Sequence, residues 1–168
     1  MTLPLEILYI RLRNELEMCQ PHLPQDFDMS EGSLTSFPLK VDISLDRTPG
    51  PVMENGKLSY RYNHRLQLII GREYPFEKPL VIWMTPIFHP NIMMPEDGGH
   101  VCIKLLSEWS FNSTLLTFIK GLESMLLSPN GTSPFGTDSC TAAAQYFNSN
   151  PRRAPPVVVA PAPKVVRR

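Results

Sequence analysis

Residues 37–45, with the sequence FPLKVDISL, alternate between apolar and polar side chains. Alternate residues of an extended chain point to opposite sides, so the apolar side chains share one face. A period of two with one polar face is typical of an antiparallel sheet that is exposed on one side. This stretch therefore predicts a strand whose buried face is formed by Phe37, Leu39, Val41, Ile43 and Leu45.

Two more strands are expected after this one. Residues 60–70 alternate in the same way, and residues 80–84 form a shorter apolar stretch. Between the first two strands, residues 46–57 contain two prolines and two glycines, which predicts a turn. The three strands together predict an antiparallel meander.

Helical spacing is found on both sides of the strands. Apolar residues within 5–16 recur at i, i+3, i+4, i+7 and i+11, which predicts an amphipathic helix with Thr2 as its N-cap. The same kind of spacing returns over residues 115–126, where Asn112 or Ser113 can cap the helix. Because strands and helices are segregated along the chain, the sequence predicts an α+β domain.

The remaining stretches are shorter or irregular. Residues 20–35 predict a loop, and the alanines within residues 138–147 predict a short helix. Residues 85–112 show no period and are too long for a routine connection between two elements. Such long irregular segments in compact domains are usually either functional or disordered.

Composition and charge narrow the class of protein. With 168 residues, of which 42% are hydrophobic and 19% charged, one globular domain over residues 1–150 is expected, followed by a flexible, basic, Pro/Val-rich tail over residues 151–168. The tail holds five basic residues and no acidic ones, which leaves 11 basic and 16 acidic residues in the domain. An acidic domain argues against a nucleic-acid partner, and the lack of a long apolar run argues against a membrane span. Three widely spaced cysteines and no signal-peptide pattern predict a cytoplasmic protein without a disulfide framework.

The candidate chemistry lies within residues 73–134. The motifs there are, in order, Tyr74-Pro75-Phe76, His89-Pro90-Asn91, Cys102, Trp109, Ser128-Pro129-Asn130 and Ser133-Pro134. A cysteine in an irregular segment can act as a nucleophile through its thiolate. His89 and His100 are the only histidines near Cys102 in the sequence. A cysteine–histidine protease would also need a base and an orienting third group, and neither is evident. Transthiolation needs less, because the incoming thioester carbonyl is already activated.

A metal site is not expected. His100 and Cys102 form one pair of possible ligands, and two further ligands at a suitable spacing are missing.

This ordered set of motifs resembles the ubiquitin-conjugating enzyme family, and the resemblance covers about residues 2–150. It implies the ubiquitin-conjugating-enzyme fold, with an N-terminal helix, an antiparallel meander, a long active-site segment and shortened C-terminal helices. It further implies that Cys102 accepts ubiquitin or a ubiquitin-like modifier as a thioester from an activating enzyme. The modifier would then be transferred to a substrate lysine with a RING-type ligase. No cofactor is implied, because the activating enzyme consumes the ATP.

The resemblance also assigns roles to single residues. Asn91 matches an asparagine that supports the active-site loop or stabilises the oxyanion, and His89 and Pro90 match structural neighbours in its triplet. Asn130 and Ser133 match positions that line the path of the acceptor lysine. The positions that match a ligase-binding surface are Arg11, Arg13, Phe76, Phe111 and Asn112.

The chain also departs from the family pattern. Asn91 and Cys102 are 11 residues apart, with an insertion around residues 93–99, and Lys104 stands where many members have an acidic residue. Phe111-Asn112 replaces a common Pro-Ala pair. The short C-terminal part predicts a reduced member, of the kind expected in a prokaryote with a minimal ubiquitin-like system. Two alternatives stay open, a non-catalytic module that binds a modifier or a ligase, and a modifier-removing protease.

Overall fold

The central sheet has three antiparallel strands in the order β1–β4–β5. They are β1 (Leu39–Leu45), β4 (His64–Ile70) and β5 (Leu80–Trp83). Val41 pairs with Leu68, and Leu68 pairs with Val81, so apolar residues meet in register across the sheet. The buried and exposed positions of β1 alternate along the strand, which confirms the half-buried strand that the sequence predicts.

A separate two-stranded hairpin occupies the stretch where the sequence predicts only a turn. It consists of β2 (Gly50–Glu54) and β3 (Lys57–Arg61), so the strand expected over residues 60–70 is divided between β3 and β4. Asn55 and Gly56 connect the two strands, with φ angles of 51° and 76°. Asn-Gly readily adopts these positive angles and matches the twist of a two-residue hairpin. The turn prediction was therefore wrong for most of its length.

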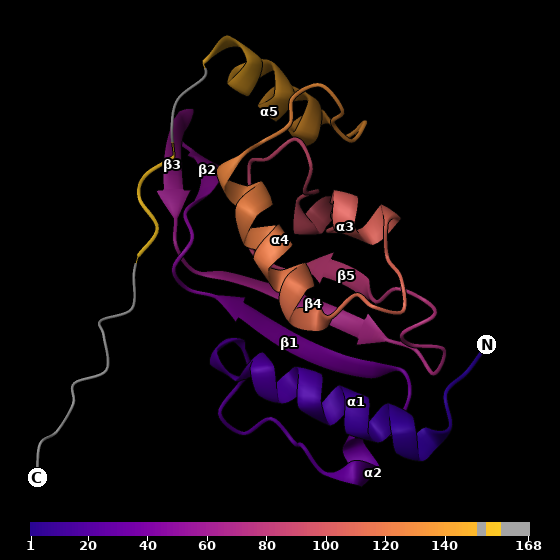
Figure 1. The fold of residues 1–168 in the computed structure, drawn as a ribbon. Helices are drawn as coiled ribbons and strands as arrows, with labels where there is room; N and C mark the ends of the chain where they lie inside the picture. The colour runs from indigo at the N-terminus through magenta and orange to yellow at the C-terminus, as the bar shows by residue number, and fades with distance from the viewer. Residues whose placement is uncertain (151–153, 159–168) are drawn as a thin grey trace, which may run out of the picture.

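Two helices cover the buried face of the central sheet (Figure 1). They are α1 (Leu5–Met18) and α4 (Leu115–Leu127), and both were predicted from their spacing. The core between them and the sheet includes Leu12, Phe118 and Trp83, each at most 1% exposed. Full burial of each such side chain contributes roughly 1.5–3 kcal/mol.

The predicted helix caps are wrong at both of these helices. Pro4, not Thr2, precedes the first turn of α1, where no side chain caps the helix. At α4 the cap is Thr114, not Asn112 or Ser113, and its hydroxyl accepts the backbone N–H of Thr117 at 3.2 Å. Thr114 is the cap because its backbone is extended, which lets its hydroxyl reach the first turn of α4.

Short helices lie within the stretches that the sequence predicts as irregular. The loop after α1 contains a 3-10 turn at Gln20–His22 and α2 (Glu31–Leu34). The segment after β5 contains a 3-10 turn at Pro95–Asp97 and α3 (Lys104–Ser107). The last helix, α5 (Asp138–Ser149), confirms the predicted alanine-rich helix.

The computed structural model describes residues 1–150 and 154–158. Within the second range, the carbonyl of Pro156 accepts the Tyr62 hydroxyl and the Val158 N–H donates to the carbonyl of Arg47, both at 2.9 Å. The basic residues of the predicted tail all lie outside the described residues: Arg152, Arg153, Lys164, Arg167 and Arg168. Among the helices described, none has the length and apolar character needed to cross a membrane.

Candidate active site

The side chain of Cys102 is exposed and faces an open groove. It lies two residues before α3, and the wall across the groove is formed by α4 and by the loop that follows α4. The other two cysteines, Cys19 and Cys140, are fully buried, and burial raises the pKa of both thiols. The groove therefore holds the one exposed thiol of the chain. Its lining residues are Asn91, Cys102, Ile103, Lys104, Ser107, Gly121, Ser124, Met125, Ser128, Asn130 and Ser133.

The inserted residues before Cys102 fold back on themselves. The Met93 N–H donates to the carbonyl of His100 at 2.8 Å, and this hydrogen bond joins the two ends of the inserted loop. Gly99, at a φ of 67°, passes so close to β5 that a Cβ there would lie 2.5 Å from the Trp83 carbonyl oxygen. The inserted loop is therefore held both at its two ends and against β5. It does not separate Cys102 from Asn91, because the Cys102 N–H donates to the Asn91 carbonyl at 2.9 Å.

Asn91 is buried and joins the two walls of the groove. Its side-chain N–H groups donate to the carbonyls of Asn130 and Ser133 at 3.2 and 3.3 Å. Its side-chain oxygen accepts the backbone N–H of Asn130 at 2.9 Å. The amide of Asn91 is thus fully engaged in holding the loop after α4 next to the segment that carries Cys102.

His89 links the segment that carries Asn91 to the end of α4. Its Nδ1 accepts the Asn91 backbone N–H at 3.0 Å, and its Nε2 donates to the carbonyl of Met125 at 2.9 Å. These partners require the neutral ring with the proton on Nε2. Burial lowers the pKa of His89 to about 4. Pro90 adds a further contact to the loop, because its carbonyl accepts the Phe135 N–H at 3.1 Å.

Among the described residues, no histidine, aspartate or glutamate lines the groove beside Cys102. His89 is buried and both of its ring nitrogens are engaged, and His100 is exposed but does not line the groove. In the described part of the chain, no group of three His, Cys, Asp or Glu residues is placed to hold a metal ion. The nucleophile that the described groove presents is the exposed thiol of Cys102.

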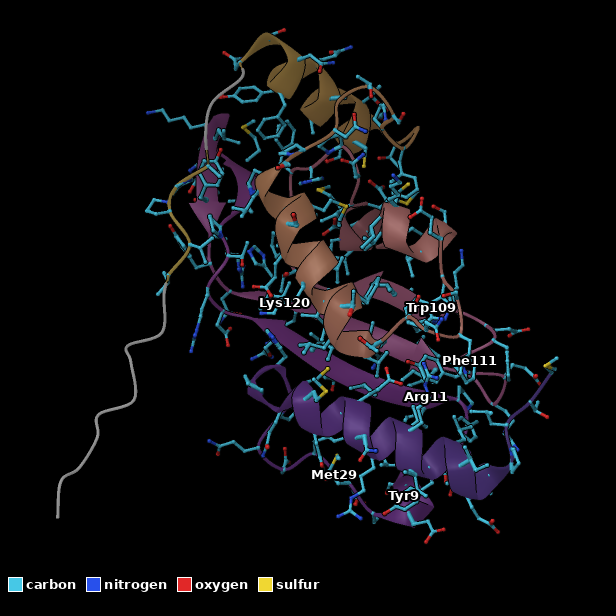
Figure 2. All side chains as sticks on the ribbon, viewed as in Figure 1. Tyr9, Arg11, Met29, Trp109, Phe111 and Lys120 are labelled. Atoms are coloured by element: carbon cyan, nitrogen blue, oxygen red, sulfur yellow. The ribbon has the colours of Figure 1, made fainter. Side chains whose placement is uncertain are left out.

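A second surface unites most of the residues expected at a ligase-binding site. Arg11 donates to the carbonyls of Phe111 and Ser113 at 2.7 and 2.9 Å, and its guanidinium lies 4.8 Å from the Phe111 ring centroid. Figure 2 shows Arg11 of α1 pointing to Phe111 in the loop before α4, with Trp109 nearby. The ring centroids of Phe76 and Phe111 are 5.4 Å apart, and both side chains are exposed.

A buried carboxylate stabilises this second surface from inside. Glu15 accepts hydrogen bonds from the Tyr74 hydroxyl at 2.7 Å, the Leu115 N–H at 2.8 Å and the Arg11 guanidinium at 2.8 Å. Burial and the neighbouring Glu15 raise the pKa of Tyr74, which remains a donor. Arg11 is half-buried, because its donors are used by Glu15 and by the loop that carries Phe111.

The structure places the remaining two residues of the expected surface differently. Asn112 is exposed and lines a shallow groove with Arg11 and Phe111. Arg13 lies on another side of α1, where it pairs with Glu17 at 3.2 Å and lines a different groove beside the loop after α1. Arg13 is therefore separated from the other residues of the predicted set.

Several groove residues were missed by the sequence analysis. On α4 they are Gly121, Ser124 and Met125, and on α3 they include Ser107; Ser128, just beyond α4, stood in a motif but was given no role. Gly121, Ser124 and Ser128 are spaced i, i+3 and i+7, so they lie on one side of the helix. This row of small residues at helical spacing, beside the apolar stripe of α4, is the sequence pattern that could have indicated the groove.

Comparisons with known proteins agree with this geometry. A family model described as ubiquitin-conjugating enzyme matches residues 38–154. The chain is 30% identical over 91 residues to ubiquitin-conjugating enzyme E2 N of Macaca fascicularis, covering 54% of this chain and 55% of that one. It is 33% identical over 87 residues to ubiquitin-conjugating enzyme E2 21 of Caenorhabditis elegans, covering 51% and 38%. The matched regions thus span about half or less of the length of these curated relatives.

Solved structures show the same fold. S. cerevisiae Ubc12 superposes with a TM-score of 0.62 and 26% identity, over 85% of this chain and 70% of that one. A Toxoplasma gondii ubiquitin-conjugating enzyme E2 domain superposes with a TM-score of 0.60 and 24% identity, over 84% and 87%. The predicted arrangement of an N-terminal helix, an antiparallel sheet and C-terminal helices is confirmed by these neighbours.

Proposed function

The chain belongs to the ubiquitin-conjugating enzyme family, and we propose that it carries ubiquitin or a ubiquitin-like modifier as a thioester on Cys102. The observation that supports this proposal is the exposed thiol of Cys102 in a groove, while Cys19 and Cys140 are buried. The Cys102 thiolate attacks the activated carbonyl of the modifier on an activating enzyme, and the thiolate of that enzyme leaves. The thioester energy is kept, so the step needs neither a cofactor nor a metal on this chain.

The surroundings of Cys102 support roles for its neighbours. The engaged amide of Asn91 favours the loop-holding role among the two that the family resemblance leaves open. His89 and Pro90 hold this corner in place, and Asn130 and Ser133 flank the approach of the acceptor. The modifier is expected to end on a lysine of a substrate protein.

The surface around Phe76 and Phe111 is the proposed binding site for a RING-type ligase. Both rings are exposed, and Arg11 and Glu15 hold the Phe111 loop against α1. An Asn112 side chain at the rim is also free to contact a partner surface. Exposed aromatic rings on a rigid support are the kind of residues that provide much of the binding energy at protein interfaces.

A charging assay tests the proposed function. Purified protein is mixed with a ubiquitin-like protein, its activating enzyme and ATP, and is separated on non-reducing gels. The expected result is a thiol-sensitive band that is heavier by one modifier, is absent from Cys102→Ala and persists in the matched control Cys140→Ala. Binding of the modifier without any such band would favour a non-catalytic binding module, and release of the free modifier from a C-terminal ester would favour a protease.

A further inference from the structure

A further groove lies between α1 and the loop that follows this helix, and we call it the α1–loop groove. Its apolar lining comes from Leu16 of α1 and from Leu23, Phe27 and Met29 of the loop. The three loop side chains are only half-buried against the core, so part of each stays open to the groove. Figure 1 shows the loop on the side of α1 that faces away from the central sheet. The groove therefore leaves apolar surface open to a bound segment.

The rim of the α1–loop groove is acidic. Asp26 and Asp28 are exposed and alternate along the loop with the apolar residues that line the groove. Within the described part of the chain, neither aspartate forms an ion pair. The one cation among the described lining residues is Arg13, and it is already paired with Glu17 at 3.2 Å. A segment that brings both apolar side chains and cations would therefore match the floor and the rim together.

Residues 164–168 have this composition. Their sequence is Lys-Val-Val-Arg-Arg, so two valines stand between cations, and they lie outside the described residues. Residues 1–150 hold 11 basic and 16 acidic residues, a net charge of −5, whereas residues 151–168 hold five basic residues and no acidic one. The valines can enter the apolar groove while the flanking cations face the carboxylates of its rim.

The described part of the tail ends close to the loop that forms this groove. The Val158 N–H donates to the carbonyl of Arg47 at 2.9 Å. Arg47 lines a neighbouring groove together with Pro21 and His22, which belong to the same loop as the residues of the α1–loop groove. The chain from Val158 to Lys164 spans about 20 Å when extended. It can therefore pass from Arg47 along Pro21 and His22 to the α1–loop groove.

We propose that residues 164–168 dock in the α1–loop groove of the same molecule, with Val165 and Val166 on its apolar floor and the flanking cations beside Asp26 and Asp28. A weak affinity is sufficient, because a short linker keeps the two partners at an effective concentration in the millimolar range. The contact is reversible and weakens as salt is added, since its ion pairs are exposed. The inference is independent of the proposed function, because it involves neither Cys102 nor its groove.

Zero-length cross-linking of the full chain tests the docking. A carbodiimide joins a lysine amine to a carboxylate where the two are in contact, and mass spectrometry of the digested protein identifies the pair. We expect Lys164 to be joined to Asp26, Asp28 or Glu17 at least about fivefold more often than to carboxylates elsewhere on the domain. Mixing unlabelled with isotope-labelled protein shows whether the joined residues come from one molecule. Absence of these cross-links, or cross-links that form only between two molecules, would overturn the proposal.

Paired variants of the tail separate docking of the valines from loose attraction between charges. Val165→Asp should lower the cross-link yield at Lys164 about fivefold or more, because it brings a carboxylate into an apolar groove with an acidic rim. The matched control is Val157→Asp, which makes the same change at an exposed residue of the described tail and should alter the yield by less than about twofold. Equal yields in the two variants would show that the valines do not enter the groove, and would overturn the proposal.

A charge added to the groove tests the other partner without removing a cross-linked group. Gln25→Arg places a cation on the rim at an exposed lining residue and should lower the yield about threefold. Arginine is used because its guanidinium does not take part in the cross-linking reaction. The control is Gln145→Arg, the same change at an exposed residue of α5, which should leave the yield unchanged. A yield that Gln25→Arg does not lower would contradict docking at this groove.

Discussion

The backbone N–H of Cys102 donates to the carbonyl of Asn91 at 2.9 Å, although the inserted loop lies between them in sequence. The side chain of Asn91 meanwhile holds the carbonyls of Asn130 and Ser133. One residue thus fixes the distance between the two walls of the groove. The insertion is accommodated outside this contact, since its own ends are paired at Met93 and His100.

Replacing Asn91 should therefore loosen the groove. In Asn91→Asp an oxygen replaces the donor that faces two carbonyl oxygens, and in Asn91→Ala the same groups lose their partner. We expect each variant to lower the free energy of unfolding by roughly 1–3 kcal/mol, with Asp the worse at neutral pH because of its charge. Urea unfolding measures this, and Asn14→Ala, at an exposed residue of α1, is the control. An Asp variant as stable as the unaltered protein would contradict the hydrogen-bond assignment.

Changes at Glu15 should report on the support of the second surface. Glu15→Gln places an amide against Arg11 and loses their ion pair, which should cost roughly 1.5–3 kcal/mol. Tyr74→Phe removes one donor and leaves Glu15 with Arg11 and the Leu115 N–H, so its cost should be smaller, about 1 kcal/mol. Thermal and urea unfolding rank the two variants. A greater loss in Tyr74→Phe would show that the carboxylate is not the centre of this network.

Stability should fall in mild acid because of His89. Its pKa is lowered by burial to about 4, against an ordinary value of 6.5, so the unfolded chain binds the proton more readily. Stability from this residue is fully present above pH 6.5 and is lost as the pH falls toward 4, by about 3 kcal/mol in all. Burial lowers the pKa of His64 as well, which acts in the same direction. Urea unfolding between these pH values should show a slope that is shallower in His89→Gln, and an equal slope would contradict the assignment.

Truncation after Asn150 tests the expected domain boundary. The described contacts of residues 154–158 with the domain include two exposed hydrogen bonds, to Tyr62 and Arg47. Their loss should lower the melting temperature by at most about 4 °C. Differential scanning calorimetry measures the change. A much larger decrease would mean that residues 151–168 form part of the folded domain.

The sequence alone predicts most of the fold, because periodic burial decides it. The alternation in β1 and the helical spacing in α1 and α4 reflect one-sided burial, and all three elements are present. The β2–β3 hairpin was missed because its prolines and glycines hid the Asn55-Gly56 signal. The cap of α4 was missed because the backbone conformation decides which of several neighbouring Ser, Thr and Asn residues caps the helix, and the sequence does not show that conformation.

The candidate site was also predicted only in part. Cys102, Asn91 and Asn130, which the ordered motifs assign to one site, line the same groove. Sequence could not show that the Asn91 amide is fully engaged, since this depends on a loop 39 residues away. Arg13 lies apart from the surface around Phe111 because of how α1 packs on the domain. The sequence positions of Arg11 and Arg13 alone could not predict this difference. The structure was also needed to show that Lys104 is the charged side chain among the described residues that line the groove.

The most direct test of the central claim is to locate the modifier on the charged protein by mass spectrometry. The intact mass should rise by one modifier, and the site should map to Cys102; in Cys102→Ser the adduct should become an ester that resists thiols and is cleaved by base. A modifier found on Cys19, on Cys140 or on a lysine, or normal charging of Cys102→Ala, would contradict the account.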